Sequence, residues 1–319
     1  MQGRPDMSER RIIGVDVAKG KVDVYDLQSK KSKTLALAQY PAWVEKLAQD
    51  KPDLVILEAS GGYERQLVGH LAAAELPVAI VNPGRVRHFC QAIGYQAKTD
   101  EMDARGLALY AEAVKVQAQK LPDQATLDLR ALLERRRQMV AIKAAETNRL
   151  EQAYLPRVKK SLKKSIQFYE KQIAALEAEI GDIVRDVPEW RDAEDLLTTV
   201  PGVGEVTART LLAEIPDLGQ LDRQQIASLA GLAPFNDDSG KRQGKRHIRG
   251  GRSEVRRVLY MATMTAAIVV KNEYITPIYK RLLEKGKTFK VAITACMRKM
   301  LLLLNSMMKN RRPFMAKTS

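Results

Sequence analysis

Four acidic residues stand at positions where their side chains could act together. Asp16 and Glu58 each end a short apolar stretch, while Asp100 and Asp103 stand three residues apart near the start of an expected helix, so they share one helix face. Carboxylates brought to one point repel each other unless a cation neutralises them, and such hard oxygen ligands favour Mg²⁺ or Mn²⁺. Two such ions roughly 4 Å apart suit in-line phosphoryl transfer. The pattern therefore predicts a metal-dependent phosphoryl-transfer site.

A second group of residues is strongly basic and rich in glycine. Residues 239–257 hold eight Lys or Arg residues against a single acid, Glu254. Glycines let a backbone approach a ligand closely, and clustered cations bind phosphates without reading sequence. We expect nucleic-acid contacts from Lys241, Arg242, Lys245, Arg246, His247, Arg249, Arg252 and Arg256. The alternative is a solvated basic loop without a ligand.

A third feature is the turn Pro201-Gly202-Val203-Gly204, which separates two segments of helical periodicity. Two glycines allow a tight turn that exposes backbone N–H groups at the start of the next helix, where a phosphate can bind. This sequence resembles the helix-hairpin-helix motif of DNA-binding proteins. Gly202 and Gly204 are therefore predicted nucleic-acid contacts, and a plain helical corner is the alternative.

The elements that must position the four acids alternate between strands and helices. Strands are expected at 11–16, 21–27, about 34–38, 54–58 and 78–81, with a hairpin turn at 18–21. Helices are expected at 41–49, 63–74 and 99–113, with a loop after residue 84. This order predicts a mixed α/β sheet in which Asp16 and Glu58 end central strands.

The remainder of the chain reads as helical. Residues 127–187 lack strand signals and carry an apolar stripe, which fits a long helical hairpin, a dimerising coiled coil or ordinary core helices. From residue 196 the chain is mostly helical, apart from the basic segment. We therefore expect three parts: a catalytic domain at 8–122, a helical linker at 123–190 and a helical domain at 191–319.

The composition indicates a polyanionic partner and excludes several classes of protein. The chain has 319 residues, 45% of them apolar, and a net charge of +15, of which residues 196–319 contribute most with 22 Lys or Arg against 9 acids. Such segregation favours nucleic-acid binding over general solubility. Two distant cysteines, Cys90 and Cys296, argue against a disulfide framework, and the short apolar runs argue against a membrane protein. A cytoplasmic protein is expected.

Several motifs along the chain together resemble one known family, the DEDD insertion-sequence transposases, which are relatives of the Piv and MooV DNA invertases. They are GVDVAK at 14–19, LEASGGYE at 57–64, VNP at 81–83, KTDEMDA at 98–104, PGVG at 201–204, GLAP at 231–234 and DSGK at 238–241. The resemblance spans about residues 10–310. It implies a RuvC-like (RNase H-type) N-terminal domain with Asp16, Glu58, Asp100 and Asp103 as ligands of Mg²⁺.

The same resemblance implies a helical C-terminal domain with a catalytic serine, which falls at Ser239. Some members of the family are guided by a non-coding RNA from the element's own flanks, and a dimer or tetramer shares the active sites. A serine hydroxyl is a weak nucleophile unless its proton is removed or its oxygen is coordinated. The sequence around Ser239 contains no catalytic-triad motif. We therefore expect a composite site in which the metal cluster of the N-terminal domain activates Ser239.

Three functions remain open at this point. The first is a recombinase that cuts and rejoins DNA through a phosphoserine link, which keeps the phosphodiester energy. The second is a RuvC-like junction nuclease that uses water, with the C-terminal domain as a DNA clamp. The third is a nucleic-acid-binding protein without catalysis. The full set of acids argues against the third function. The basic segment that starts at Ser239 (residues 239–257, the serine segment) favours the first.

Overall fold

The computed structural model describes residues 10–59, 61–95, 100–119, 121–235 and 246–315, with only the backbone described at 100–102. The chain divides into two compact units, 1–121 and 122–319. Each unit has its own buried core.

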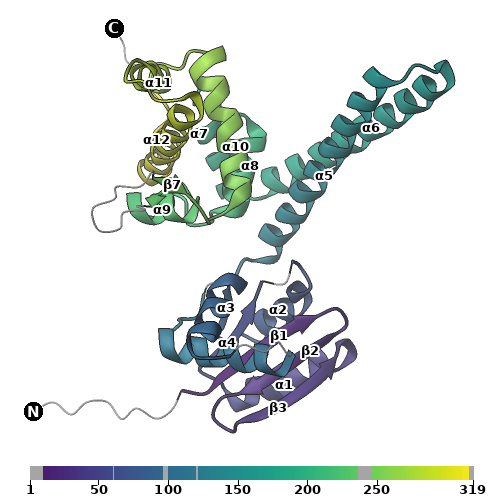
Figure 1. Ribbon diagram of the computed structural model, residues 1–319, viewed down its shortest axis with the longest axis vertical. Coiled ribbons are helices and arrows are strands. Elements are labelled where there is room, and N and C mark those ends of the chain that lie inside the picture. Colours follow the sequence, from purple (N-terminus) through teal and green to yellow (C-terminus); the bar gives the residue numbers. More distant parts are fainter. Residues whose placement is uncertain (1–9, 60, 96–99, 120, 236–245, 316–319) are drawn as a thin grey trace, which may run out of the picture. The chain divides into compact units, whose positions relative to one another are not determined.

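The first unit is built on a five-stranded sheet in the order β3-β2-β1-β4-β5 (Figure 1). Its strands are β1 (Ile12–Ala18), β2 (Lys21–Asp26), β3 (Lys31–Ala36), β4 (Leu54–Glu58) and β5 (Val78–Val81). The first three pair antiparallel as a meander, and β1, β4 and β5 pair parallel. This order and these directions are those of an RNase H-type sheet, so the expected RuvC-like mixed sheet is present.

Helices cover both faces of this sheet because its strands alternate apolar side chains to either side. Helices α1 (Tyr40–Asp50) and α2 (Glu64–Ala73) pack with Val15 and Leu57 on one face. Helices α3 (Pro83–Ala92) and α4 (Asp100–Val114) pack with Ile12 and Ile56 on the other. A single 3-10 turn, η1 (Leu37–Gln39), joins β3 to α1. Asp16 and Glu58 lie on the face that α4 covers.

One expectation for this unit was wrong. Residues following Pro83 form α3 rather than a loop. Asn82 ends the strand but also caps the helix, because its side-chain oxygen accepts a hydrogen bond from the N–H of Gly84 at 2.8 Å. Pro83 occupies the first helical turn, where its missing N–H costs nothing. Asn-Pro-Gly is a turn signal in isolation, and only the helix that follows shows it to be a cap.

The second unit begins with a long helical hairpin. Helices α5 (Gln124–Gln152) and α6 (Pro156–Asp186) run side by side, as Figure 1 shows. Asp123 caps α5 by accepting from the N–H of Thr126. The buried residues near the base, Leu129, Ile180 and Val184, pack with Ala213 of α8 (Glu205–Glu214), which ties the hairpin to the helices that follow.

The rest of the unit is a helical core with one two-stranded ribbon. The helices are α7 (Pro188–Thr198), α8 (Glu205–Glu214), α9 (Arg223–Leu229), α10 (Ser253–Met264), the π-helical turn η2 (Thr265–Val269), α11 (Ile275–Glu284) and α12 (Phe289–Asn310). The ribbon pairs β6 (Pro234–Phe235) with β7 (His247–Ile248). This core is the largest in the chain and draws most heavily on α12.

Helix α12 is long and apolar enough to cross a membrane by length and composition, but half of its most apolar window is buried inside the protein. Residues such as Ile293, Met300 and Leu304 are fully buried in the core of the second unit. In this structure α12 therefore packs as a central helix of the second unit's core.

Candidate active site and nucleic-acid interface

The sheet register brings Asp16 and Glu58 side by side. Val15 of β1 pairs with Leu57 of β4 in parallel, and the next residue on each strand is the acid. Side chains alternate along a strand, so both acids point to the face opposite Val15 and Leu57. That is the face covered by α3 and α4. Asp16 is only 9% exposed, so its charge lies largely out of water.

Helix α4 lies directly on this part of β1. Gly14, two residues before Asp16, has no side chain, and a Cβ there would lie 2.1 Å from the carbonyl oxygen of Ala104. Ala104 follows Asp103, so Asp103 belongs to the helix that covers the face of the sheet on which Asp16 and Glu58 lie. Asp16 and Glu58 therefore end neighbouring strands, and a third predicted acid lies on the helix packed over them.

The fourth acid, Asp100, is the first residue of α4, and its side chain lies outside the described residues. Among the side chains that are described, no three His, Cys, Asp or Glu residues are close enough to hold a metal ion. The predicted ligands all offer hard carboxylate oxygens, and Asp16 is largely buried, so their donor chemistry fits Mg²⁺ or Mn²⁺. Metal binding by these acids stays a prediction.

Asp23 is a fifth acid at this edge. It pairs directly with Asp16 across the antiparallel β1–β2 ladder, so both side chains point to one face. It is buried, at 8% exposed, and accepts a hydrogen bond from the Thr34 hydroxyl. The ammonium of Lys21 lies 3.2 Å from its other oxygen. These two partners support a structural role for Asp23.

Cys90 of α3 lies under the other side of α4, where a Cβ on Gly106 would lie 2.6 Å from its sulfur. Burial raises the pKa of the Cys90 thiol, and the nearby negative charge of Asp103 raises it further. The thiol therefore stays protonated, and the structure supports a packing role for this cysteine.

In the second unit the β6–β7 ribbon joins the two ends of the serine segment. Phe235 of β6 pairs with His247 of β7. Ser239, Lys241, Arg242 and Lys245 lie outside the described residues, and their predicted roles stay predictions. Two glycines are in close contact beside the ribbon. Gly231 and Gly251 both have positive φ, and their backbones approach so closely that neither residue could carry a Cβ.

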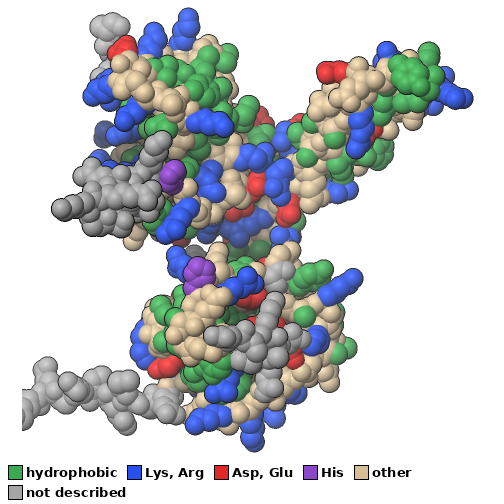
Figure 2. All heavy atoms as spheres, viewed as in Figure 1, with side chains coloured by type: hydrophobic (Ala, Val, Ile, Leu, Met, Phe, Trp, Pro, Cys, Tyr) green, Lys and Arg blue, Asp and Glu red, His purple; other side chains and the backbone are tan. Residues whose placement is uncertain are grey.

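The described cations of this segment divide into two groups. Arg246, His247 and Arg249 are exposed, and the Arg249 guanidinium stacks 4.9 Å from the ring centre of Phe235. Figure 2 shows Lys and Arg side chains spread over the visible face of this unit. The exposure of these three residues is compatible with phosphate binding, and their phosphate contacts stay predictions.

Arg252 and Arg256 are turned inward. Arg256 donates to the carbonyl of Ala230 at 3.1 Å and also to that of Gly250, so it braces the ribbon. Arg252 is half-buried, and its Nη1 is buried without a hydrogen-bond partner in the described part of the chain. Burial lowers the pKa of Arg252, and the nearby charge of Arg130 lowers it further. In this structure the Arg256 side chain braces the ribbon, and the predicted phosphate contacts of both arginines stay predictions.

The Pro-Gly-Val-Gly turn lies between α7 and α8, as expected. Gly202 has φ +102°, and a Cβ there would lie 2.7 Å from the Cβ of Ala266, so this position requires glycine. Gly204 is the N-cap of α8 and has no side chain with which to cap it. Helix, turn and helix are present, while a DNA-binding helix-hairpin-helix stays a prediction.

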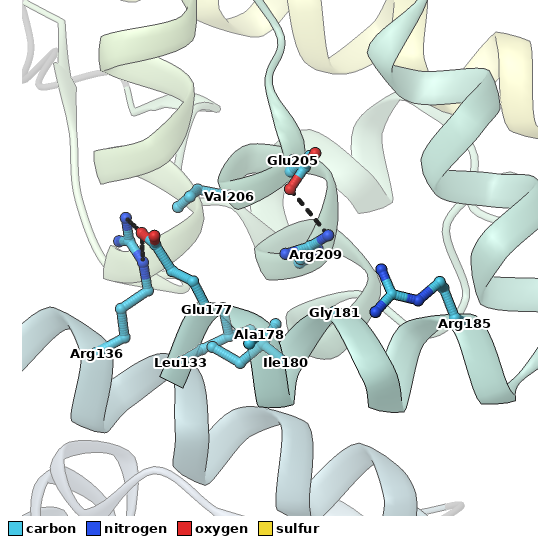
Figure 3. Close-up of a pocket in the computed structure, with 10 residues that line it drawn as sticks. All are labelled: Leu133, Arg136, Glu177, Ala178, Ile180, Gly181, Arg185, Glu205, Val206 and Arg209. Atoms are coloured by element: carbon cyan, nitrogen blue, oxygen red, sulfur yellow. Dashed lines mark hydrogen bonds and ion pairs between the residues drawn. The ribbon is translucent and has the colours of Figure 1, made fainter. Parts of the chain in front are cut away.

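A pocket of about 280 Å³ opens beside the start of α8 (Figure 3). Three guanidinium groups line it, but each already has a carboxylate partner. Arg136 pairs with Glu177 at 2.5 Å, Arg185 with Asp182, and Arg209 with Glu194 and Glu205. Since these charges are balanced, the pocket does not strengthen the case for a phosphate at the turn.

Two stretches of the chain match families of known proteins. Residues 13–157 match the DEDD transposases of IS110-type elements, and residues 194–280 match the transposase family of IS116, IS110 and IS902. The first stretch contains all four predicted metal ligands and the second contains Ser239. The chain belongs to the DEDD transposase family of IS110-type insertion sequences.

Relatives of this transposase-family chain extend over its length. The pilin gene-inverting protein of Moraxella bovis is 29% identical over 315 residues, which cover 95% of this chain and 97% of the relative. The IS1111A transposase of Coxiella burnetii is 25% identical over 75% of this chain and 73% of its own length. RuvC of Thermus thermophilus aligns with 34% of this chain and 99% of itself, at 14% identity and a TM-score of 0.27. The strand order, rather than that score, identifies the sheet as RNase H-type.

Proposed function

We propose that this protein is a DNA transposase or site-specific recombinase that cuts and rejoins strands through a phosphoserine intermediate formed at Ser239. The observation that carries the proposal is the alignment of Asp16 with Glu58 on neighbouring strands, under the helix that carries Asp103, in a chain of the IS110 transposase family. The pilin gene-inverting and insertion-element relatives support recombination as the reaction.

The acidic edge would hold Mg²⁺ or Mn²⁺ through Asp16, Glu58, Asp100 and Asp103. Such ions, when bound, stabilise the negative charge that develops during phosphoryl transfer. The protein's own contribution is positional. The β1–β4 register fixes two carboxylates, and the Gly14–Ala104 approach sets the position of the third. The burial of Asp16 strengthens its interaction with a cation, because less water screens the charge.

In the proposed reaction the Ser239 oxygen forms a bond to the phosphorus of a DNA phosphodiester and loses its proton. The bond from phosphorus to the 3′ oxygen breaks, and that oxygen takes up a proton to leave a free 3′ hydroxyl. A 3′ hydroxyl from another strand can later attack the phosphoserine and release the serine. No water or nucleotide cofactor is consumed, which suits rejoining better than hydrolysis.

The exposed cations Arg246, His247 and Arg249 would hold the backbone phosphates around the attacked bond. Arg249 is held in place by its stacking on Phe235, which reduces the conformational freedom that binding must remove. Such contacts give affinity and salt dependence rather than sequence choice. Removing two of these cations should lower the slope of log affinity against log salt by about 0.9 for each duplex phosphate that the protein no longer neutralises.

The direct test is a search for a covalent protein–DNA adduct. The protein would be made together with its native flanking DNA, given element-end and target DNA with Mg²⁺, and stopped in denaturant. Wild type should form an adduct that Ser239→Ala and Asp16→Ala both lack, while both variants should bind DNA nearly as wild type does. Cleavage without an adduct that Ser239→Ala leaves unchanged would instead favour the junction nuclease that uses water.

We also propose a homodimer or tetramer joined through the outer half of the α5–α6 hairpin. Val140, Ile142 and Phe168 are 37%, 38% and 55% exposed there, although they lie on helices whose apolar side chains would normally be covered. Phe168→Glu should reduce the mass measured by light scattering to that of a monomer. An unchanged mass would contradict this surface.

The family resemblance further supports a non-coding guide RNA from the element's own flanks. RNA of defined sequence should copurify with the protein expressed with those flanks, and ribonuclease treatment should abolish target choice. Target recognition that survives complete removal of RNA would contradict this part of the proposal.

A further inference from the structure

A polar groove and an apolar pocket adjoin on the surface of the second unit. The groove, of about 610 Å³, is lined by the start of α9, Tyr274 and the second half of α12. The pocket, of about 440 Å³, lies between α11, the end of α12 and the segment that follows it. Four residues, Tyr274, Leu303, Ser306 and Asn310, line both cavities, so the two are continuous.

The groove is positively charged and its charges are not balanced. Arg223, Lys299 and Lys309 line it and are all exposed. None of the three forms an ion pair with any residue that the structure describes. Among the described lining residues Asp222 is the only acid, and its Oδ1 already accepts hydrogen bonds from the N–H groups of Gln224 and Gln225. The groove therefore suits a polyanion.

The length of the groove suits a chain of phosphates rather than one anion. Lys299 and Lys309 are ten residues apart on one helix, which separates them by about 15 Å along its axis. Backbone phosphates of one strand repeat every few ångströms, so several fit within that distance. A single free phosphate could contact only one end of the groove.

The groove is also built in advance. The buried side chain of Asn305 accepts from the N–H of Gly219 at 2.8 Å and donates to the carbonyl of Leu221 at 2.9 Å. Gly219 has φ +98°, and a Cβ there would lie 2.9 Å from the backbone nitrogen of Lys309. These contacts hold the chain leading to Arg223 tightly against α12. The three cations therefore need little reorganisation to bind a ligand.

The adjoining pocket can take a flat, partly polar group. Pro277, Ile278 and Met307 provide apolar walls, and Tyr274 is 40% exposed at the boundary with the groove. Phe314 closes the pocket and is held there because its N–H donates to the Thr199 hydroxyl at 3.0 Å. An aromatic ring beside a row of cations is the arrangement by which proteins bind single-stranded nucleic acid, with bases stacked on the ring.

Asn310 and Arg312 add hydrogen-bonding groups to the same pocket. The Watson–Crick edge of a base offers its donors and acceptors to such groups only when the base is unpaired. A base inside a duplex could not enter, since its faces are covered by its neighbours. The pocket therefore favours an unpaired base over a duplex.

We propose that this groove and pocket bind a single-stranded segment of nucleic acid, with phosphates along Arg223, Lys299 and Lys309 and one unpaired base against Tyr274. The site shares no residue with the serine segment or with the Pro-Gly-Val-Gly turn. The inference rests on the proposed function in so far as a recombinase must handle unpaired strands. It would give the protein a second nucleic-acid contact away from the predicted chemistry.

The test is a binding measurement on the full chain in EDTA, so that catalysis plays no part. Fluorescence anisotropy would follow labelled 12-nucleotide single strands and the matching duplex over a range of salt concentrations. Replacing Lys299 and Lys309 together by Ala should lower the single-strand salt slope by about 1.4, at about 0.7 per phosphate contact. The matched control replaces Lys285 and Lys287, which are equally exposed but lie outside both cavities, and should leave the slope unchanged.

The base pocket is tested by Tyr274→Leu, which should weaken single-strand binding about 5- to 150-fold and leave duplex binding unchanged. Tyr274→Phe should restore binding because it keeps the ring. Tyr154→Leu is the matched control, since Tyr154 is 84% exposed at the hairpin tip. Equal losses for single strand and duplex, or a Tyr274→Leu variant that binds as wild type does, would overturn the pocket.

Binding of single-stranded RNA and of single-stranded DNA with the same sequence would show which of the two the site prefers. Tighter binding of either single-stranded molecule than of the duplex supports the site. Equal slopes for the Lys299/Lys309 pair and its control would overturn the groove. Failure here is distinguishable from failure of the proposed function, because adduct formation by the same variants is measured separately with Mg²⁺. Absence of the adduct with normal single-strand binding would count against the serine mechanism alone.

Discussion

The contact between Gly14 and α4 gives a sharp prediction about how the acidic edge is held together. Replacing Gly14 by Ala would put a Cβ 2.1 Å from the carbonyl oxygen of Ala104 and 2.9 Å from the nitrogen of Ala108. Carbon and oxygen atoms that are not bonded approach to no less than about 3.3 Å. The backbone of α4 must therefore move away from β1 by roughly 1 Å, and Asp103 moves with it.

The expected cost follows from this displacement. Overpacking of a buried position destabilises a protein by about 1–3 kcal/mol, so the first unit should remain folded but melt at a lower temperature. A misplacement of about 1 Å at a reacting centre can cost about 100-fold in rate. Gly14→Ala should thus slow strand transfer by about that factor or more, while DNA binding stays intact.

The measurement pairs thermal unfolding with a strand-transfer assay and an anisotropy assay for DNA. Gly69→Ala is the matched control, because Gly69 lies inside α2 with nothing within 4 Å of an added Cβ. It should stabilise the protein by about 0.5–1 kcal/mol and leave strand transfer intact. A folded Gly14→Ala variant with wild-type strand transfer would refute the placement of Asp103 through this contact.

Three further predictions concern the second unit. Burial raises the pKa of the Cys296 thiol to about 11, above its unfolded value near 9. The free energy of unfolding should therefore be highest below pH 9 and fall by about 1.4 kcal/mol per pH unit between pH 9 and 11, where only the unfolded state loses the proton. Urea unfolding should show this fall in wild type more than in Cys296→Ala. Arg209→Met should cost about 3–5 kcal/mol in urea unfolding by leaving Glu194 unpaired in a nearly buried site, while changing both residues to apolar ones should cost less. Gly202→Ala should lower the melting temperature because φ +102° and the Ala266 contact both exclude a side chain, and an unchanged temperature would contradict this.

Much of the first unit could be predicted from residue order alone. Alternating and continuous apolar stretches marked β1, β2, β4 and β5 within a residue or two, because burial of a sheet face imposes a period of two. The third strand runs over Lys31–Ala36, earlier than expected, since only Leu35 of it is buried and the apolar signal is weak. Helix α3 was missed because Asn82-Pro83 marks a turn and a helix start equally well.

In the second unit the helices were predictable, but the roles of the basic residues were not. The sequence does not distinguish Arg246 from Arg256, because both lie in the same charged stretch. In the folded chain Arg246 is exposed, while Arg256 donates to two carbonyl groups. Likewise the row of Arg223, Lys299 and Lys309 joins residues that are up to 86 positions apart, so no local pattern could reveal it.

The sequence by itself determined the kinds of group available and the elements that carry them: acids at strand ends, a glycine turn, and cations concentrated in the last third of the chain. These follow from local periodicity and composition, which are properties of neighbouring residues. Only the tertiary structure decided which of them meet. The β1–β4 register aligns Asp16 with Glu58, the bare Cα of Gly14 admits α4, and Asn305 draws the loop at Gly219 onto α12. Each of these depends on backbones far apart in sequence approaching to contact distance, and packing rather than local preference sets that approach.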